Sequence, residues 1–167
     1  MAWLKQLAGF EGVAKQWPDL DLDRILGEMS RLNGIMNIEA GVDGEELLAT
    51  FLQRLAKRGI EISSEQFTAI TDPLSRIYAI PDHLHALCNM LGDGLVPSNA
   101  KAGYLARMLA RRTLRMRDEL GIDVSLADLA LHHIEVNLGN KVMKQTHDGI
   151  ATILSLEEAK YVEMLRK

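Results

Sequence analysis

Six lysine and arginine residues lie between positions 101 and 117, and no acidic residue separates them. Arg107, Arg111 and Arg115 are four positions apart, so on an α-helix their side chains line one side. Tyr104 falls beside them. The planar donor fork of arginine matches phosphate oxygens bidentately. The stretch predicts a phosphate-binding helix face; a solvated surface face is the alternative, although surface helices usually mix both signs of charge.

The sequence Pro-Ser-Asn at positions 97–99 stands directly before this face. We expect Asn99 in the first turn of the helix, where free N–H groups attract anions. The side-chain amide of Asn99 offers donors and acceptors that could meet a base edge. The alternative is that Ser98 and Asn99 only cap the helix.

Arg112 is expected to have a structural role. At 100° per residue it falls on the apolar arc that includes Leu105 and Met116, so its charge would be buried. A buried arginine needs an acidic partner, and Asp82 or Asp93 could supply one. The prediction is therefore a structural ion pair between Arg112 and one of these aspartates.

Two histidines and the single cysteine invite a metal site, which the spacing argues against. His83 and His85 point about 160° apart on a helix, and Cys88 falls on an apolar stripe. His132 and His133 are adjacent and also diverge, and His133 lies on an apolar arc, which is typical of a core histidine. We expect no metal ligands in this chain, and no nucleophile or phosphate-loop motif is present either.

The predicted fold is all-α: a compact bundle of about eight helices, with two small lobes as an alternative. Apolar residues recur at spacings of three and four, which is the helical period. Ser63 with Gln66 has the spacing of a capping box. Ser125 and Ser155, each with an acid three residues on, are expected to open further helices.

The N-terminal residues 1–19 are predicted to form one helix with an aromatic stripe, ended by Pro18, that could dock against a partner. Residues 20–167 would form the main helical domain. Pro73 is expected to start a long helix, and Pro81 to kink it or start it later. A weak boundary near Asp72 is the one candidate for a division into lobes.

Composition limits the partners. The net charge is −4 and the pI is about 5.7, so attraction to phosphates must be local, and we expect neither DNA nor a membrane among the partners. No apolar run approaches the length of a membrane span, and the first ten residues do not fit a signal peptide. The single cysteine excludes an intramolecular disulfide, so we expect a cytoplasmic protein.

The segment IYAIPDHLHALCNMLGDGLVPSNAKAGYLARMLARR, residues 77–112, resembles a segment of alanyl-tRNA synthetases. The family pattern has I-A-D-H, then D-G-x-x-P-S-N, then G-Y-x-x-R-x-x-x-R-R. The similarity extends from about residue 20 to the C-terminus, where the chain resembles the archaeal version. Three positions depart from the pattern: Pro81 replaces an alanine, His85 stands where arginine is common, and Lys101 occupies a position usually given to glycine.

The resemblance implies an all-helical tRNA-recognition domain that grasps the acceptor stem. In the family the asparagine of P-S-N, here Asn99, helps recognise a wobble G-U pair, together with an aspartate further along the chain than this sequence extends. Arg107 and Arg111 would then position the RNA backbone, Tyr104 would support the turn or stack on a sugar, and Lys101 and Arg115 would add phosphate contacts.

The resemblance also implies what lies elsewhere. ATP, Mg²⁺ and Zn²⁺ would belong to other domains of the ligase, and so would its aminoacylation and editing active sites. The expected partners are alanine tRNA and the catalytic domain of the same ligase. A helical protein-interaction module that does not bind RNA remains the alternative.

Overall fold

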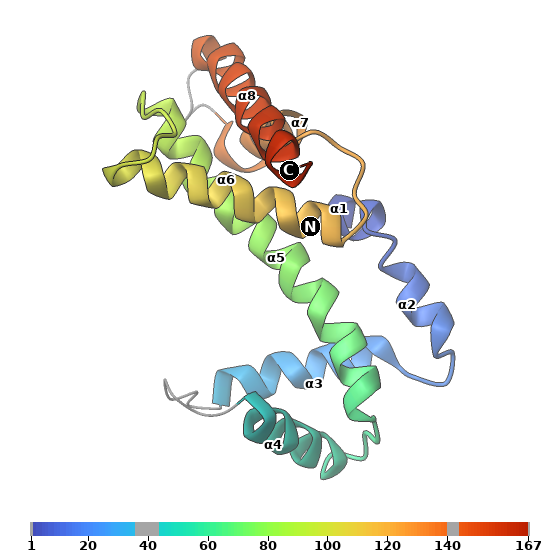
Figure 1. Cartoon of the computed structure of the whole chain (residues 1–167). Helices are drawn as coiled ribbons and strands as arrows, with labels where there is room; N and C mark the ends of the chain where they lie inside the picture. Colours follow the sequence, from blue (N-terminus) through green and yellow to red (C-terminus); the bar gives the residue numbers. More distant parts are fainter. Residues whose placement is uncertain (1, 36–43, 140–143, 167) are drawn as a thin grey trace. The chain divides into compact units, whose positions relative to one another are not determined.

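The computed structural model describes residues 2–35, 44–139 and 144–166, and within these ranges every regular element is helical (Figure 1). The all-α prediction is confirmed. Eight α-helices are described, with a π-helical turn at Ile134–Leu138 and a 3₁₀ turn at Lys144–Thr146. The α-helices are α1 (Ala2–Leu7), α2 (Glu11–Gln16), α3 (Leu22–Ile35), α4 (Gly44–Ala56), α5 (Ser64–Gly92), α6 (Lys101–Glu119), α7 (Leu126–His133) and α8 (His147–Leu165).

The chain forms two compact units. One unit contains residues 9–74, and the other contains residues 1–8 and 75–167. The main change of unit, between Leu74 and Ser75, falls close to the boundary expected near Asp72. The predicted division at residue 19 is not tested by this partition, and a docking role for residues 1–19 stays a prediction.

The unit of residues 9–74 has its own apolar core between α3, α4 and the start of α5. Its buried members are Ile25, Phe51, Leu55, Ile60 and Phe67. The capping box that opens α5 is present as predicted. The Gln66 backbone N–H donates to Ser63 Oγ at 3.1 Å, and the Ser63 N–H donates to Gln66 Oε1 at 3.0 Å.

The other unit is built from the later part of α5 with α6, α7 and α8. The apolar stripe on which Cys88 was predicted to fall is confirmed, because its side chains on α5 are buried: Ile77, Ile80, Leu84, Leu87, Cys88 and Leu91. Ser125 caps α7 as predicted, accepting a hydrogen bond from the Asp128 N–H at 3.0 Å. On α8 the buried positions are Ile150, Leu154, Glu157 and Tyr161.

Two predicted helix starts, at Pro73 and at Ser155, are wrong. Helix α5 is continuous from Ser64 to Gly92, so it does not begin at Pro81 either, and the alternative of a kink at Pro81 stays a prediction. A proline removes one backbone hydrogen bond, and here the loss is offset because apolar residues before and after each proline are buried. Ser155 does not open a helix, since it lies inside α8.

The N-terminal residues do not form the single helix that was predicted. Helix α1 ends at Leu7 and α2 begins at Glu11, with Gly9 between them at φ +61°, a conformation that only glycine adopts readily. The predicted stripe of Trp3, Phe10 and Trp17 is therefore broken up: Trp3 lies in α1, whereas Phe10 and Trp17 flank α2 at its two ends. No helix within the described residues is both long enough and apolar enough to cross a membrane.

Candidate nucleic-acid interface

The loop before α6 carries Asn99 at the surface. Helix α6 begins at Lys101, with Ala100 in extended backbone as its N-cap residue and no side-chain capping bond. Asn99 therefore lies in the loop and not in the first turn, which corrects the prediction. Ser98 does not cap the helix either, because its hydroxyl bonds locally, donating to the Ala100 carbonyl at 3.0 Å. Asn99 is exposed.

The backbone at the start of α6 has two special positions. Lys101 has φ +50°, a left-handed conformation that favours glycine. This gives a physical reason why the family pattern has glycine at the position where this chain has lysine. Gly103 is buried against the loop, and its carbonyl accepts a hydrogen bond from the Ser98 N–H at 2.9 Å. A Cβ on Gly103 would lie 2.7 Å from the Val96 carbonyl oxygen and would overlap Ser98 Oγ. Close approach of the loop to α6 thus requires glycine.

Arg107 joins this loop to α8. Its Nε and Nη2 donate to Oε2 and Oε1 of Glu157, each at 3.1 Å, and its Nη1 donates to Asn99 Oδ1. Its Nη2 also contacts the Pro97 carbonyl at 3.3 Å. The side chains of Arg107 and Glu157 are only 17% and 3% exposed. The guanidinium group of Arg107 is therefore held within the fold. This corrects the prediction that it belongs to an outward cationic stripe.

The Glu157 carboxylate is stabilised in its charged form. Burial raises its pKa, but hydrogen bonds from Arg107 and Lys160 outweigh that effect, so the pKa lies below its ordinary value. Lys160 Nζ lies 2.9 Å from Glu157 Oε1. The sequence contains one indication of this role: Glu157 falls on the apolar stripe of α8, between Leu154 and Tyr161. A charged residue at such a position indicates a buried pair, and sequence reasoning missed it.

The remaining predicted contacts have mixed environments. Lys101 and Tyr104 are exposed, and Arg115 has a side chain 76% exposed that pairs with Glu119 at 2.9 Å. Glu119 also binds Arg76. Arg111 is half-buried: its Nη1 lies 3.7 Å from the sulfur of Met164, and its Nε is buried with no hydrogen-bond partner in the described chain. Lys101 and Tyr104 thus lie at the surface, as Asn99 does, whereas Arg111 points partly into the fold.

The predicted structural ion pair of Arg112 is wrong. Arg112 is exposed, as are Asp82 and Asp93, and no ion pair within the described residues joins Arg112 to either aspartate. The reason is the choice of buried face on α6. The deeply buried positions are Gly103, Ala106, Ala110, Thr113 and Leu114. On the predicted apolar arc, Leu105 is exposed and Met116 is only half-buried.

Arg117 has the structural role that was expected of Arg112. Its side chain is 12% exposed and pairs with Glu158 of α8 and with Asp118. Glu158 Oε2 also accepts a hydrogen bond from the Leu126 N–H at 2.9 Å, which satisfies a free donor at the start of α7. Two adjacent glutamates of α8, Glu157 and Glu158, therefore hold two arginines of α6.

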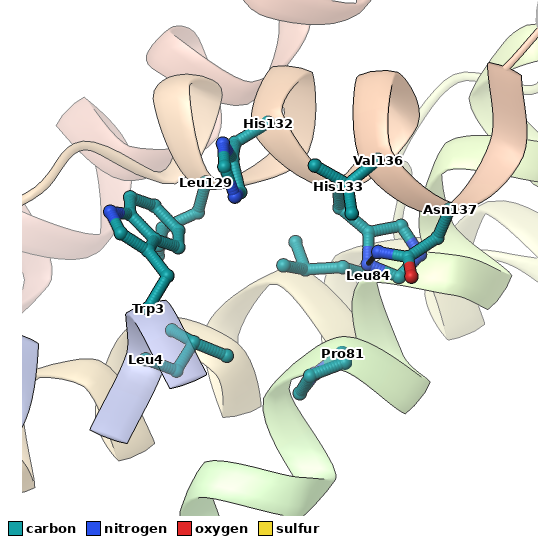
Figure 2. Close-up of a pocket in the computed structure, with 9 residues that line it drawn as sticks. All are labelled: Trp3, Leu4, Pro81, Leu84, Leu129, His132, His133, Val136 and Asn137. Carbon is teal, nitrogen blue, oxygen red and sulfur yellow. Dashed lines mark hydrogen bonds between the residues drawn. The ribbon is translucent and has the colours of Figure 1, made fainter. Parts of the chain in front are cut away.

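A small pocket lies beside α7, where Trp3 and His132 stack with ring centroids 3.9 Å apart (Figure 2). His133 is buried as predicted, and its Nδ1 lies 3.3 Å from the Asn137 amide nitrogen. It is not the fully satisfied core histidine that was expected, because its buried Nε2 has no hydrogen-bond partner among the described residues. Burial, followed by the nearby charges of His85 and His132, lowers the pKa of His133.

The residues considered for a metal site in the sequence are not grouped in the structure. Cys88 is fully buried, and burial raises the pKa of its thiol to about 12. Among the residues with a described position, no three His, Cys, Asp or Glu side chains are grouped to hold a metal ion.

Comparison with known proteins agrees with the resemblance found in the sequence. The family of tRNA synthetases class II (A) matches residues 23–167. The alanine–tRNA ligases of Pyrococcus furiosus and Thermococcus kodakarensis are 42% and 41% identical over 165 residues, and that of Methanothrix thermoacetophila is 37% identical over 164. Each alignment covers 98% of this chain but 17% of the relative's length. The chain belongs to the class II (A) tRNA synthetase family and corresponds to a segment of its alanine–tRNA ligases.

Proposed function

We propose that this chain contacts the acceptor stem of alanine tRNA, with Asn99 directed at the minor groove. The name of the relatives, alanine–tRNA ligase, supports alanine tRNA as the RNA. An acceptor stem is an A-form helix, whose wide and shallow minor groove displays base edges and 2′-hydroxyls. The observation that carries the proposal is the exposed Asn99 amide, held in one orientation by the buried pair of Arg107 and Glu157.

The phosphate contacts follow from the charges that α6 leaves at the surface. Lys101 and Arg115 are exposed cations on the two ends of the helix, and Arg112 adds a third. The bond between Arg115 and Glu119 is solvent-exposed, so phosphate can replace the carboxylate at little cost. Arg111 contributes through its outer nitrogens, because its Nε is buried.

Filter binding of labelled alanine tRNA to the 167-residue chain tests the proposal. We expect binding that weakens with salt, and the Arg115→Ala variant should weaken it for every RNA while lowering the slope of log affinity against log salt by about one. Arg111→Ala should act in the same direction. Lys57→Ala, which removes an exposed charge from the other unit, is the control. Salt-independent binding, or equal slopes for all three variants and the wild type, would contradict the proposal.

The alternative of a protein-interaction module depends on free aromatic side chains at the N-terminus. Trp3 packs against His132 with tilted rings, and Phe10 is buried with 8% of its surface exposed. Trp17 is half-buried, so the open aromatic face that a docking surface needs is available only in part. A contact between this chain and the catalytic domain of the same ligase remains part of the proposal through the resemblance alone.

A further inference from the structure

The bond between Arg107 and Asn99 determines which end of the Asn99 amide faces outward. A guanidinium group has only donors, so the atom of Asn99 that faces Arg107 Nη1 must be the carbonyl oxygen. The NH₂ group is therefore on the opposite side. Because Asn99 is exposed, its two N–H donors are available to a partner, while its oxygen is engaged by Arg107. The acceptors that such donors fit are the O2 and N3 atoms of bases and the 2′-hydroxyl oxygens in a minor groove.

Arg107 is itself oriented from α8. Two parallel hydrogen bonds to Glu157 fix the plane of the guanidinium, which leaves Nη1 directed at the loop. The Pro97 carbonyl accepts a further bond from Nη2, so one guanidinium contacts both the loop backbone and the Asn99 side chain. Glu157 is 50 positions from Arg107 in the sequence, and its side chain is almost fully buried.

We propose that Glu157 and Arg107 are positioning residues that hold the donor end of Asn99 outward, so that α8 controls what the loop can recognise. This inference rests on the proposed contact of Asn99 with RNA. Arg107 acts through Asn99 and not as a phosphate contact. Loss of the Glu157 charge frees the guanidinium to turn, and Asn99 then loses its fixed orientation.

Glu157→Gln is the test variant, and Glu158→Gln is its matched control. Both remove one carboxylate from α8 and one arginine pair with α6, but Glu158 holds Arg117 and not the Asn99 loop. With an unmodified alanine tRNA transcript, Glu157→Gln should bind about three- to tenfold more weakly at fixed salt, the equivalent of one hydrogen bond. Its salt slope should equal that of the wild type. Glu158→Gln should keep the wild-type affinity.

A double-mutant cycle with Asn99→Ala separates this inference from the proposed function. If Glu157 acts through Asn99, Glu157→Gln has no further effect on affinity in the Asn99→Ala chain. If Asn99→Ala itself leaves affinity unchanged, the proposed base contact fails. If Asn99→Ala weakens binding but Glu157→Gln does not, the positioning role alone is overturned. A fall of about one in the salt slope of Glu157→Gln would also overturn it, since Arg107 would then touch phosphate.

A measurement without RNA tests the geometry directly. In ¹⁵N NMR spectra of the chain, Glu157→Gln should shift the Asn99 side-chain NH₂ signals together with the Arg107 Nε–H signal. Glu158→Gln should shift the Arg117 Nε–H signal and leave those of Asn99 in place. Unmoved Asn99 signals in a folded Glu157→Gln chain would refute the positioning role, whatever the chain binds.

Discussion

Gly103→Ala is the most direct probe of how the loop is held against α6. The added Cβ would lie 2.7 Å from the Val96 carbonyl oxygen and 2.9 Å from Ser98 Cβ. The carbonyl must move by about 0.7 Å, the difference between 2.7 Å and the 3.4 Å at which ordinary contact begins. That movement stretches the bond from the Ser98 N–H to the Gly103 carbonyl, which is 2.9 Å long.

The expected loss of stability combines opposing terms. Overpacking costs about 1–3 kcal/mol, and the strained hydrogen bond costs about 1 kcal/mol. Alanine recovers about 1 kcal/mol as the better helix former. The free energy of unfolding should therefore fall by about 1–3 kcal/mol, measured by urea denaturation followed by circular dichroism. For a chain of this size the Tm should fall by about 2–12 °C.

The control for this prediction is Gly149→Ala in α8. A Cβ on Gly149 meets nothing within 4 Å, so the same substitution should leave stability unchanged or raise it by up to about 1 kcal/mol. If Gly103→Ala is as stable as Gly149→Ala, the loop is not in close contact with α6, and the account of how Asn99 is held is refuted.

Three further outcomes are expected. Lys101→Gly should raise the free energy of unfolding by about 1 kcal/mol in urea titrations, because it removes the strain of φ +50°; no gain would show that this backbone is relaxed. Glu158→Ala should lower it by about 1–3 kcal/mol, because Arg117 and the Leu126 N–H both lose their acceptor, and a loss below 0.5 kcal/mol would contradict the assigned role. The pKa of His133 is lowered in the folded state, so the unfolded chain binds more protons and stability should fall as the pH drops through about 6.5; His133→Gln should flatten urea midpoints measured across that range, and an unchanged slope would contradict it.

Local patterns in the sequence predict the elements whose causes are themselves local. The capping box of Ser63 and Gln66, the cap at Ser125 and the buried stripe of α5 depend on residues within one or two helical turns. Pro73 misled the prediction of the helix start because packing on both sides outweighs the single hydrogen bond that a proline removes.

The buried face of α6 follows side-chain size more than hydropathy, which is why the prediction from apolar residues was wrong. Leu105 is 44% exposed, whereas Ala106 and Ala110 are fully buried, since small side chains allow a neighbouring helix to approach closely. The same error placed Arg112 in the core. Periodicity within one helix also carries no information about a partner 50 positions away, so the pair of Arg107 with Glu157 could be suspected only from the charge on the stripe of α8.

The exposed position of Asn99 and its neighbours Lys101 and Tyr104 agrees with the sequence prediction, whereas their contact with RNA stays a proposal. The family assignment is the firmest result that sequence reasoning reached. It depended on a motif of fixed spacing. The structure gives the reason for that spacing: the loop at positions 97–99 folds back on α6 and bonds to Gly103 and Arg107.

The most direct test of the account compares wild-type chain with Asn99→Asp in binding to an alanine tRNA transcript. Aspartate keeps an oxygen for Arg107 but replaces the outward donors with a negative charge, so the chain should stay folded while affinity falls about tenfold or more. Equal affinity of the two proteins, at the same salt concentration, would show that the donor end of Asn99 does not meet RNA.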